Sequence, residues 1–322
     1  MKALFGRILP LLVAIAALLA TFRSFVPNFL HTDNLLDLAQ QISVNAILAY
    51  GMTLVILIGG IDLSVGALLA LAGTVTAFCL VRVTNGDGTV TGLGLPLPAA
   101  VCLGLGVGLV FGLFHGFMRA WRGLPPFIIT LATMLIARGL ALGFNESKPL
   151  GIPDSHSTFL ALGNGRIPLG TYGLPVPVLV MLVLYVLMAA LLHFTVFGRH
   201  LYAIGDNRLA ALYSGIRVKR CEVFVYAIAG VLTAVAGLIH TSQLYSAEPA
   251  SGMGFELNAI AAAVVGGASL NGGRGMMTGT LLGAVIIGIL DKGLNQAGVH
   301  FSLQYVIKGA VILIAVLVDK KR

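Results

Sequence analysis

The sequence predicts an all-α integral membrane protein that crosses the bilayer about ten times, within a range of roughly eight to ten. Hydrophobic residues make up 58% of the 322 residues and charged residues only 10%, whereas a soluble domain carries about 25% charged residues. The apolar residues also gather in runs long enough to span a bilayer. A soluble fold of this size could not cover so much apolar surface, so lipid must surround most of it.

Ten apolar runs are the candidate transmembrane helices. Two of them, 258–270 and 276–291, are short and interrupted by glycine, so we expect broken or re-entrant helices there. The first run follows Lys2 and Arg7; we favour a first membrane helix that starts in the cytoplasm and keep a cleaved signal peptide as the alternative. In chain order the ten runs are 6–22, 42–60, 64–82, 97–118, 125–144, 174–196, 221–241, 258–270, 276–291 and 304–318.

The basic residues predict which side of the membrane each loop faces. Cytoplasmic loops are enriched in Lys and Arg, and a cytoplasmic N-terminus with ten crossings puts 13 of the 20 basic residues, and the C-terminus, on that side. The net charge of +8 therefore does not indicate nucleic acid binding. The cytoplasmic basic residues are Lys2, Arg7, Arg119, Arg122, Arg199, Arg208, Arg217, Lys219, Arg220, Arg274, Lys320, Lys321 and Arg322. The acids expected outside are Asp33, Asp37, Asp87, Glu146, Asp154, Glu248, Glu256 and Asp291.

The loops leave no room for a soluble domain, so residues 1–322 are predicted to form a single transmembrane domain. The longest gaps are an irregular outer stretch at about 145–173 and a cytoplasmic stretch at 197–220. A phosphate-binding Gly-Lys-Ser/Thr pattern is absent, so any ATPase must be a separate chain. The cysteines and histidines lack metal-ligand spacing, and we expect no metal, bound cofactor or catalytic residue in this chain.

Two glycine-rich segments resemble each other. Residues 59–66 read Gly-Gly-Ile-Asp-Leu-Ser-Val-Gly, residues 266–273 read Gly-Gly-Ala-Ser-Leu-Asn-Gly-Gly, and each follows an Asn-Ala-Ile triplet. This pattern predicts a parallel duplication of a four-helix unit, 1–122 and about 200–318. Chance similarity between glycine-rich apolar segments is the alternative.

The first glycine-rich segment contains an acid between two apolar runs. Asp62 can cap a helix that begins at Leu63, and Ser64 can join it. Helix punctuation is the plainer interpretation, and a broken helix beside the substrate path is the functional one. Polar residues near the second run, such as Gln40 and Gln41, can bind a sugar hydroxyl or join helices. The residues predicted to line a path or gate are Asn45, Gly59, Gly60, Asp62, Ser64, Gly66, Asn258, Gly266 and Gly267.

The cytoplasmic stretch contains a short amphipathic helix. Asp206 and Asn207 can cap a helix over 208–214, and Gly215 can end it. Its apolar residues fall at 0, 3, 4 and 7, which is the spacing of one helical stripe: Leu209, Leu212, Tyr213 and Ile216. Such a helix either lies on lipid headgroups or docks into a groove on a soluble partner.

The outer segment 246–258 carries two acids, Glu248 and Glu256. It can contact an external partner or line the entrance, and a plain connecting loop is the alternative. Two lone cations, Arg138 and Lys308, are expected to extend to the membrane interface.

Four stretches resemble the ribose-type sugar permeases of bacterial ATP-binding-cassette (ABC) importers. They are 40–73, 197–216, 246–275 and the tail 308–322. The string Gly-Gly-Ile-Asp-Leu-Ser-Val-Gly is highly specific, and the resemblance runs over nearly the whole chain.

The resemblance implies a permease subunit in the bacterial inner membrane that does no covalent chemistry itself. A periplasmic binding protein would deliver a monosaccharide, ATPase subunits would bind underneath and use the ATP, and a second permease copy or paralogue would complete a dimer in the lipid. The alternative is an ion-coupled secondary transporter of a small polar solute.

The resemblance also assigns the segment that contacts the ATPase. The family often has an acid just before the two alanines, where this chain has Arg208 and Leu209, so the chain departs from the family pattern at this point while keeping the helix. Asp206 also stands where the family commonly has glycine. The matching residues are Gly205, Asp206, Asn207, Ala210, Ala211, Gly215 and Ile216.

Overall fold

The computed structural model describes residues 2–84, 90–169 and 172–319. Helices dominate these ranges, as the sequence predicts, with one 3-10 turn at Asp154–His156. The helices are α1 (Lys2–Phe25), α2 (Thr32–Leu57), α3 (Val65–Leu80), α4 (Leu97–Arg122), α5 (Pro126–Gly143), α6 (Ser157–Asn164), α7 (Val176–Phe194), α8 (Val196–Asp206), α9 (Arg208–Tyr213), α10 (Val218–Gln243), α11 (Phe255–Val265), α12 (Met277–Gln296) and α13 (Phe301–Asp319).

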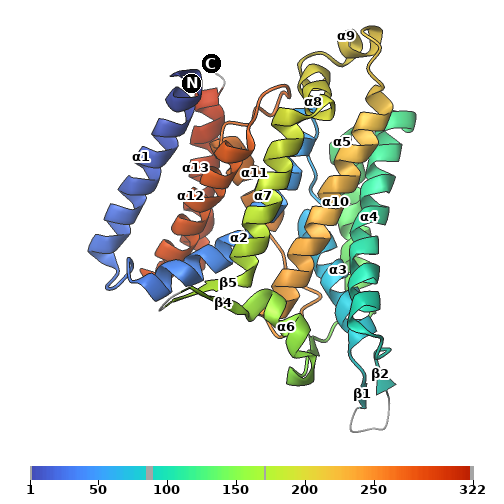
Figure 1. The fold of residues 1–322 in the computed structure, drawn as a ribbon, viewed down its shortest axis with the longest axis vertical. Helices are drawn as coiled ribbons and strands as arrows, with labels where there is room; N and C mark the ends of the chain where they lie inside the picture. Colours follow the sequence, from blue (N-terminus) through green and yellow to red (C-terminus); the bar gives the residue numbers. More distant parts are fainter. Residues whose placement is uncertain (1, 85–89, 170–171, 320–322) are drawn as a thin grey trace.

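Short antiparallel strand pairs make up the remaining regular structure of the described residues. Two of the pairs lie at the lower end of the molecule, opposite the end where both termini, α8 and α9 are found (Figure 1). The pairs are β1 (Val83–Thr84) with β2 (Val90–Thr91), β3 (Leu150–Gly151) with β6 (Ser246–Ala247), and β4 (Arg166–Leu169) with β5 (Tyr172–Pro175).

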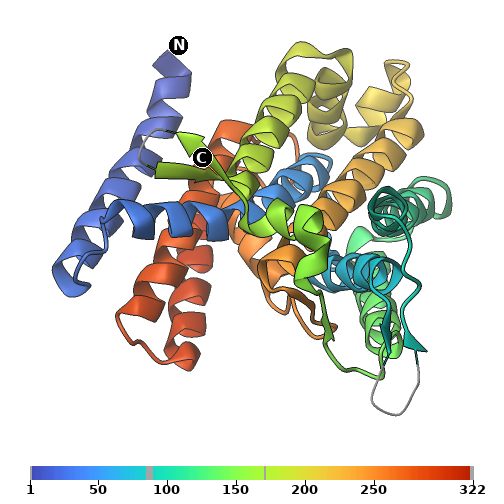
Figure 2. The same cartoon turned by 60° about the horizontal axis from the view of Figure 1, so that its bottom comes forward.

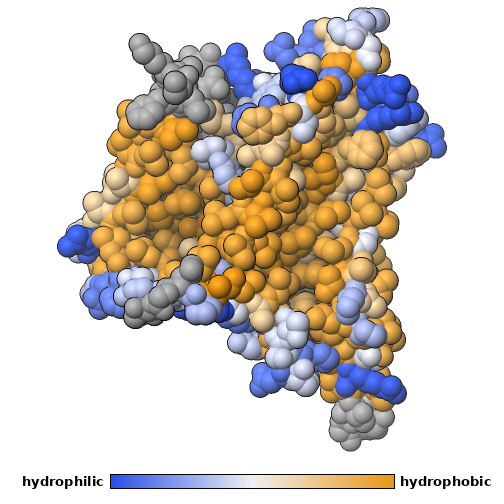
Figure 3. Space-filling view, in the orientation of Figure 1, coloured by the Kyte–Doolittle hydropathy of each residue, from blue (hydrophilic) through white to orange (hydrophobic). Residues whose placement is uncertain are grey.

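On the face shown in Figure 3, an apolar band covers the middle of the molecule, with polar residues above and below it. In the described part of the chain, 7 helices are long and apolar enough to cross a membrane. Three further apolar helices are shorter, at Val65–Leu80, Phe255–Val265 and Phe301–Ile314. A multi-pass membrane protein is therefore confirmed, whereas ten crossings and the duplicated unit remain predictions. The basic tail residues Lys320, Lys321 and Arg322, and the acid Asp87, lie outside the described residues.

Helix α2 forms the centre of the bundle. It packs against α7, α10, α11 and α12, and nearly every side chain from Ile42 to Leu57 is buried. Its first turns lie almost across the bundle rather than along it (Figures 1 and 2). By contrast, only 6% of the most apolar window of α1 is buried, so α1 lies at the edge, where lipid can cover it.

Helices α4 and α10 pack closely because small residues recur every fourth position on α4. The buried residues of this stripe begin at Ala100 and end at Ala120. A side chain added at Gly108 would clash with the backbone of Gly230 on α10, and one added at Gly116 would clash with Val223. This close contact holds two side chains of α4, His115 and Arg119, against the centre of the molecule.

Candidate functional site

The predicted helix after Asn207 is confirmed as α9. The Asn207 side-chain oxygen accepts hydrogen bonds from the backbone N–H groups of Leu209 (3.1 Å) and Ala210 (3.0 Å). The chain then leaves the helix through Gly215, whose φ of +84° is left-handed. Ala211 is buried, so α9 has one fixed inner face and one free face.

The free face of α9 is apolar. Leu209 is 60% exposed, Leu212 is 50% exposed and Tyr213 is 86% exposed, while Ile216 packs partly against the core. Helix α9 projects beyond the ends of the longer helices at the upper end of the molecule (Figure 1). An apolar stripe in this position is suited to binding another protein.

The end of α8 touches the last residue of α2 and the second glycine-rich segment. A side chain at Gly205 would clash with the carbonyl oxygen of Leu57 and with the backbone of Gly273. The Gly273 N–H also donates to the Leu57 carbonyl at 2.9 Å. The Tyr202 hydroxyl on α8 donates to the Gly275 carbonyl at 2.8 Å, and burial raises the pKa of this hydroxyl, so it stays protonated and able to donate.

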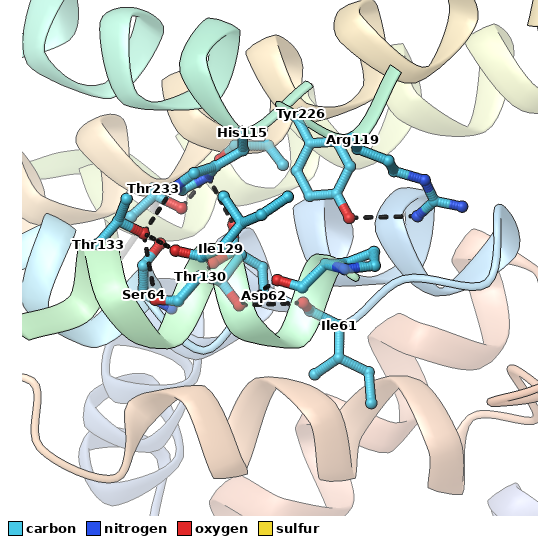
Figure 4. A network of polar contacts seen from close by, with 12 residues as sticks. Ile61, Asp62, Ser64, His115, Arg119, Ile129, Thr130, Thr133, Tyr226 and Thr233 are labelled. Atoms are coloured by element: carbon cyan, nitrogen blue, oxygen red, sulfur yellow. Dashed lines mark hydrogen bonds and ion pairs between the residues drawn. The ribbon is translucent and has the colours of Figure 1, made fainter. Parts of the chain in front are cut away.

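Residues 58–64 are non-helical and are held by buried side chains (Figure 4). One Asp62 oxygen accepts from the Ser64 N–H (2.9 Å) and the Ser64 hydroxyl (2.6 Å), and the other lies 3.7 Å from His115 Nδ1. His115 Nε2 lies 2.7 Å from the Thr133 hydroxyl. The Thr130 hydroxyl lies 3.3 Å from the Ile61 carbonyl oxygen, which it can reach as a donor.

The predicted capping role of Asp62 is wrong. Helix α3 begins at Val65 rather than at Leu63, its N-cap residue is Ser64, and no side-chain capping bond is formed. Asp62 is 2% exposed and its bonds go to Ser64 instead. Its carboxylate therefore fixes the interruption itself, and His115 on α4 provides its partner across the bundle.

Arg119 joins this segment to α10 and, through Glu222, to α9. Its Nη2 group donates to the Ile58 carbonyl, and its Nη1 group lies 3.3 Å from the Tyr226 hydroxyl. Its Nε group lies 3.1 Å from Glu222 on α10. Arg208 on α9 binds the same carboxylate through two contacts, at 2.9 Å and 3.2 Å. The hydrogen bond to Glu222 raises the pKa of Arg208, so the guanidinium group stays protonated.

A polar cavity of about 440 Å³ lies toward the lower end, between α2, α6, α10, α11 and α12. Asn45 contributes a buried side-chain oxygen that has no hydrogen-bond partner among the described residues. Amide and carboxylate side chains of this kind bind hydroxyl groups. The lining residues are Asp37, Gln40, Gln41, Val44, Asn45, Asn164, His240, Gln243, Leu244, Phe255, Gly288 and Asp291.

The polar groups of this cavity are held in place by their neighbours. The Asn258 amide donates to Asp291 at 3.3 Å, and Lys308 lies 2.7 Å from the same carboxylate. Lys308 thus pairs with Asp291, and its predicted extension to the membrane interface remains a prediction. The rings of His240 and Phe255 meet edge to face, with centroids 5.3 Å apart.

The outer segment 246–258 folds back into the molecule. Arg138 donates to the carbonyls of Pro249 (2.6 Å) and Ser251 (2.7 Å), so it anchors this segment; its position at the membrane interface remains a prediction. A side chain at Gly66 would clash with Gly252. Glu256 accepts from the Gly254 N–H at 3.2 Å, and Glu248 is half-buried.

The residues predicted for one path thus lie in two places. Asn45 lines the cavity, and Asn258 lies beside it, donating to the lining residue Asp291. Gly59, Gly60, Asp62 and Ser64 belong to the interrupted segment. Gly66 contacts the outer segment, Gly266 packs on Gly279, and Gly267 faces open space. Among the described residues, no group of three or more His, Cys, Asp or Glu side chains could hold a metal ion.

The sequence did not predict the contacts that hold the cavity and the interrupted segment. Glu222, Gln243 and Asn164 each stand alone in the sequence, and only packing of distant helices shows their partners. A buried acid at the start of an apolar run is the one signal that could have drawn attention to Glu222.

The chain is similar to known transport-system permeases over most of its length. A family model for the permease component of the branched-chain amino acid transport system matches residues 34–316. The chain is 49% identical to the ribose import permease protein of Bacillus subtilis (strain 168) over 296 residues, covering 92% of this chain and 87% of the relative. It is 42% identical to the ribose import permease protein of Escherichia coli (strain K12) over 313 residues, covering 97% and 93%.

A third relative has a different substrate in its name. The chain is 37% identical to the D-allose transport system permease protein of Escherichia coli (strain K12) over 308 residues, covering 95% of this chain and 89% of the relative. No solved structure gives a significant match. Because the family match and these relatives span most of the chain, this protein belongs to the family of transport-system permease components.

Proposed function

We propose that this chain is the membrane permease subunit of an ABC importer that moves a monosaccharide into the cell. Three relatives at 37–49% identity are named as permeases for ribose or D-allose, and the polar cavity offers groups that suit a sugar. The ATP would be bound and hydrolysed by separate ATPase subunits, and a periplasmic binding protein would deliver the sugar.

The orientation we propose places α8, α9 and both termini in the cytoplasm. The basic residues Arg199, Arg208, Arg217, Lys219 and Arg220 occur on or beside the α8–α9 hairpin, which fits the bias of cytoplasmic loops. The opposite end, with α6 and the strand pairs, would face the periplasm. The half-buried Glu248 and Glu256 of the outer segment would then be available to the binding protein.

The observation that carries this proposal is the free apolar face of α9. Leu209, Leu212 and Tyr213 are exposed on a capped helix that projects past the bundle. A helix lying on lipid would stay at the level of the polar boundary, whereas a projecting helix fits a groove on a soluble protein. We assign this groove to the ATPase subunit.

The polar cavity would form part of the sugar path. Its volume of about 440 Å³ falls in the usual range of about 300–1,000 Å³ for small-molecule sites. The unpartnered oxygen of Asn45 and the side-chain oxygens of Gln40 and Gln243 can bind sugar hydroxyls in place of water, whereas the amide nitrogens of the two glutamines already donate to the carbonyls of Gly163 and Gln40. The cavity lies toward the end that receives the sugar, so it would be filled first.

Transport would follow from a population shift between two states of a permease dimer. ATP binding closes the ATPase subunits, which carry the two α9 helices with them. The pair then favours the state that is open to the loaded binding protein, and hydrolysis returns it. This chain needs no covalent chemistry for that cycle.

The test compares two acidic substitutions on α9 in an importer reassembled in proteoliposomes. We expect Leu212→Asp to weaken copurification with the ATPase subunit and to lower ATP-driven ribose uptake by about thirtyfold or more, because a central apolar contact is worth about 2 kcal/mol or more. Ser214→Asp adds the same charge off the apolar stripe and should leave both nearly unchanged. Unimpaired uptake in Leu212→Asp, or uptake driven by a proton gradient without ATP, would contradict the proposal.

A further inference from the structure

A single buried carboxylate joins α9 to the rest of the molecule. Glu222 is 0% exposed and lies near the start of α10. On one side it accepts both the Nε and Nη2 groups of Arg208, at 2.9 Å and 3.2 Å. On the other side it accepts the Nε group of Arg119 at 3.1 Å. One acid therefore lies between two guanidinium groups that come from different helices.

The second guanidinium continues the connection to the interrupted segment. The Nη2 group of Arg119 donates to the carbonyl of Ile58, which is the C-cap residue of α2. A side chain added at Gly60 would clash with both Arg119 and Tyr226. The guanidinium of Arg119 thus lies directly against the first residues of the 58–64 segment, and only two side chains separate α9 from it.

The charges explain why this connection is firm. A buried carboxylate without a cation is costly, because burial removes its hydration. Arg119 is 11% exposed and Arg208 is 46% exposed at their side chains, so Arg119 is the inner partner and Arg208 the outer one. The two-contact binding of Arg208 fixes the direction of its guanidinium as well as its distance. A shift of α9 must therefore either move Glu222 with it or break the contacts between Arg208 and Glu222.

We propose that Glu222 is a positioning residue that carries the movement of α9 to the interrupted segment 58–64, through Arg119 and the Ile58 carbonyl. This inference rests on the proposed function, because α9 moves only if an ATPase subunit binds it and changes conformation.

The experiment separates transmission of movement from simple stability. The importer is reassembled in proteoliposomes with its ATPase subunits and binding protein, and sugar uptake and ATP hydrolysis are measured together. We expect Glu222→Gln to assemble and hydrolyse ATP, with sugar moved per ATP reduced by about two- to thirtyfold, the range for residues that couple two sites. Arg220→Gln is the matched control, since it removes a charge from the exposed side of the same helix, and should keep the wild-type ratio.

A second pair of variants keeps the inference testable if Glu222→Gln fails to fold. Arg208 is half exposed, so Arg208→Gln should fold and show a similar loss of sugar per ATP. Arg208→Lys keeps the charge and should recover part of that loss. In the variant with both Glu222→Gln and Arg208→Gln, the losses should not multiply, because the two residues act through one contact.

The outcomes are distinct for the two proposals. A wild-type ratio of sugar to ATP in Arg208→Gln, or losses that multiply in the double variant, would overturn the role of Glu222 while leaving the permease function intact. A wild-type complex that binds no ATPase or takes up no sugar on ATP would overturn the proposed function and this inference with it.

Discussion

The two glycine-rich segments look alike in sequence but are held by different means. The segment 59–66 is fixed by charged and polar side chains, among them Asp62, His115 and Arg119 (Figure 4). The segment 266–273 is fixed by backbone contacts: the Ser269 N–H donates to the Arg274 carbonyl at 2.9 Å, and the Gly273 N–H donates to Leu57.

This difference shows how one sequence pattern can serve two purposes. An interruption of a helix inside an apolar surround leaves backbone groups that must find partners. The first segment finds them on side chains of α4 and α5, so electrostatic changes on those helices can reach it. The second finds them on its own turn and on the backbone at α8, so it responds only when whole elements move.

The largest effect is expected when the acid of the first segment is removed. Asp62→Ala leaves the backbone N–H and the hydroxyl of Ser64 without their buried acceptor, and because a hydrogen bond to a charged group is worth about 1.5–3 kcal/mol, the two together cost about 3–6 kcal/mol. We expect the free energy of unfolding in mixed detergent micelles to fall by this amount. Asp33→Ala removes an acid that is 66% exposed at its side chain and should change it by about 0.5 kcal/mol or less. If the two variants proved equally stable, the side-chain network would not hold this segment.

A smaller loss is expected when a side chain is forced into the backbone contact of the second segment. In Gly266→Ala the new methyl group meets the Gly279 carbonyl on α12, and such overpacking costs about 1–3 kcal/mol. Gly139→Ala on α5 has no atom within 4 Å of the added carbon, so it should be neutral or slightly stabilising. Thermal unfolding followed by size-exclusion chromatography compares the pair, and an unchanged Gly266→Ala would show that α11 and α12 are not in firm contact.

Local patterns predicted much of this molecule and distant pairings little of it. The apolar runs marked the long helices, the Asn207 cap and Gly215 marked α9, and repeated glycines marked both interruptions, because each depends on residues close in sequence. The predicted capping role of Asp62 was wrong because its side-chain oxygen accepts hydrogen bonds from the N–H and the hydroxyl of Ser64 rather than from the N–H groups of α3. The pairing of Arg119 with Glu222 joins residues 103 positions apart, and no local pattern encodes that.

The smallest effect is expected when the hydrogen bond between Thr130 and the first segment is removed. Thr130 is buried, and its hydroxyl lies 3.3 Å from the Ile61 carbonyl and 3.0 Å from the Pro126 carbonyl of its own helix. Thr130→Val keeps the shape of the side chain and removes the hydrogen bond that this hydroxyl shares between the two carbonyls. We expect a loss of about 0.5–1.5 kcal/mol in the free energy of unfolding. The buried Thr76 hydroxyl donates to Ala72 within its own helix at 2.8 Å, and Thr76→Val should cost less, because that carbonyl already accepts the helical bond. Equal losses in the two variants would mean that the bond to Ile61 adds nothing, and that Asp62, His115 and Arg119 alone hold the interruption.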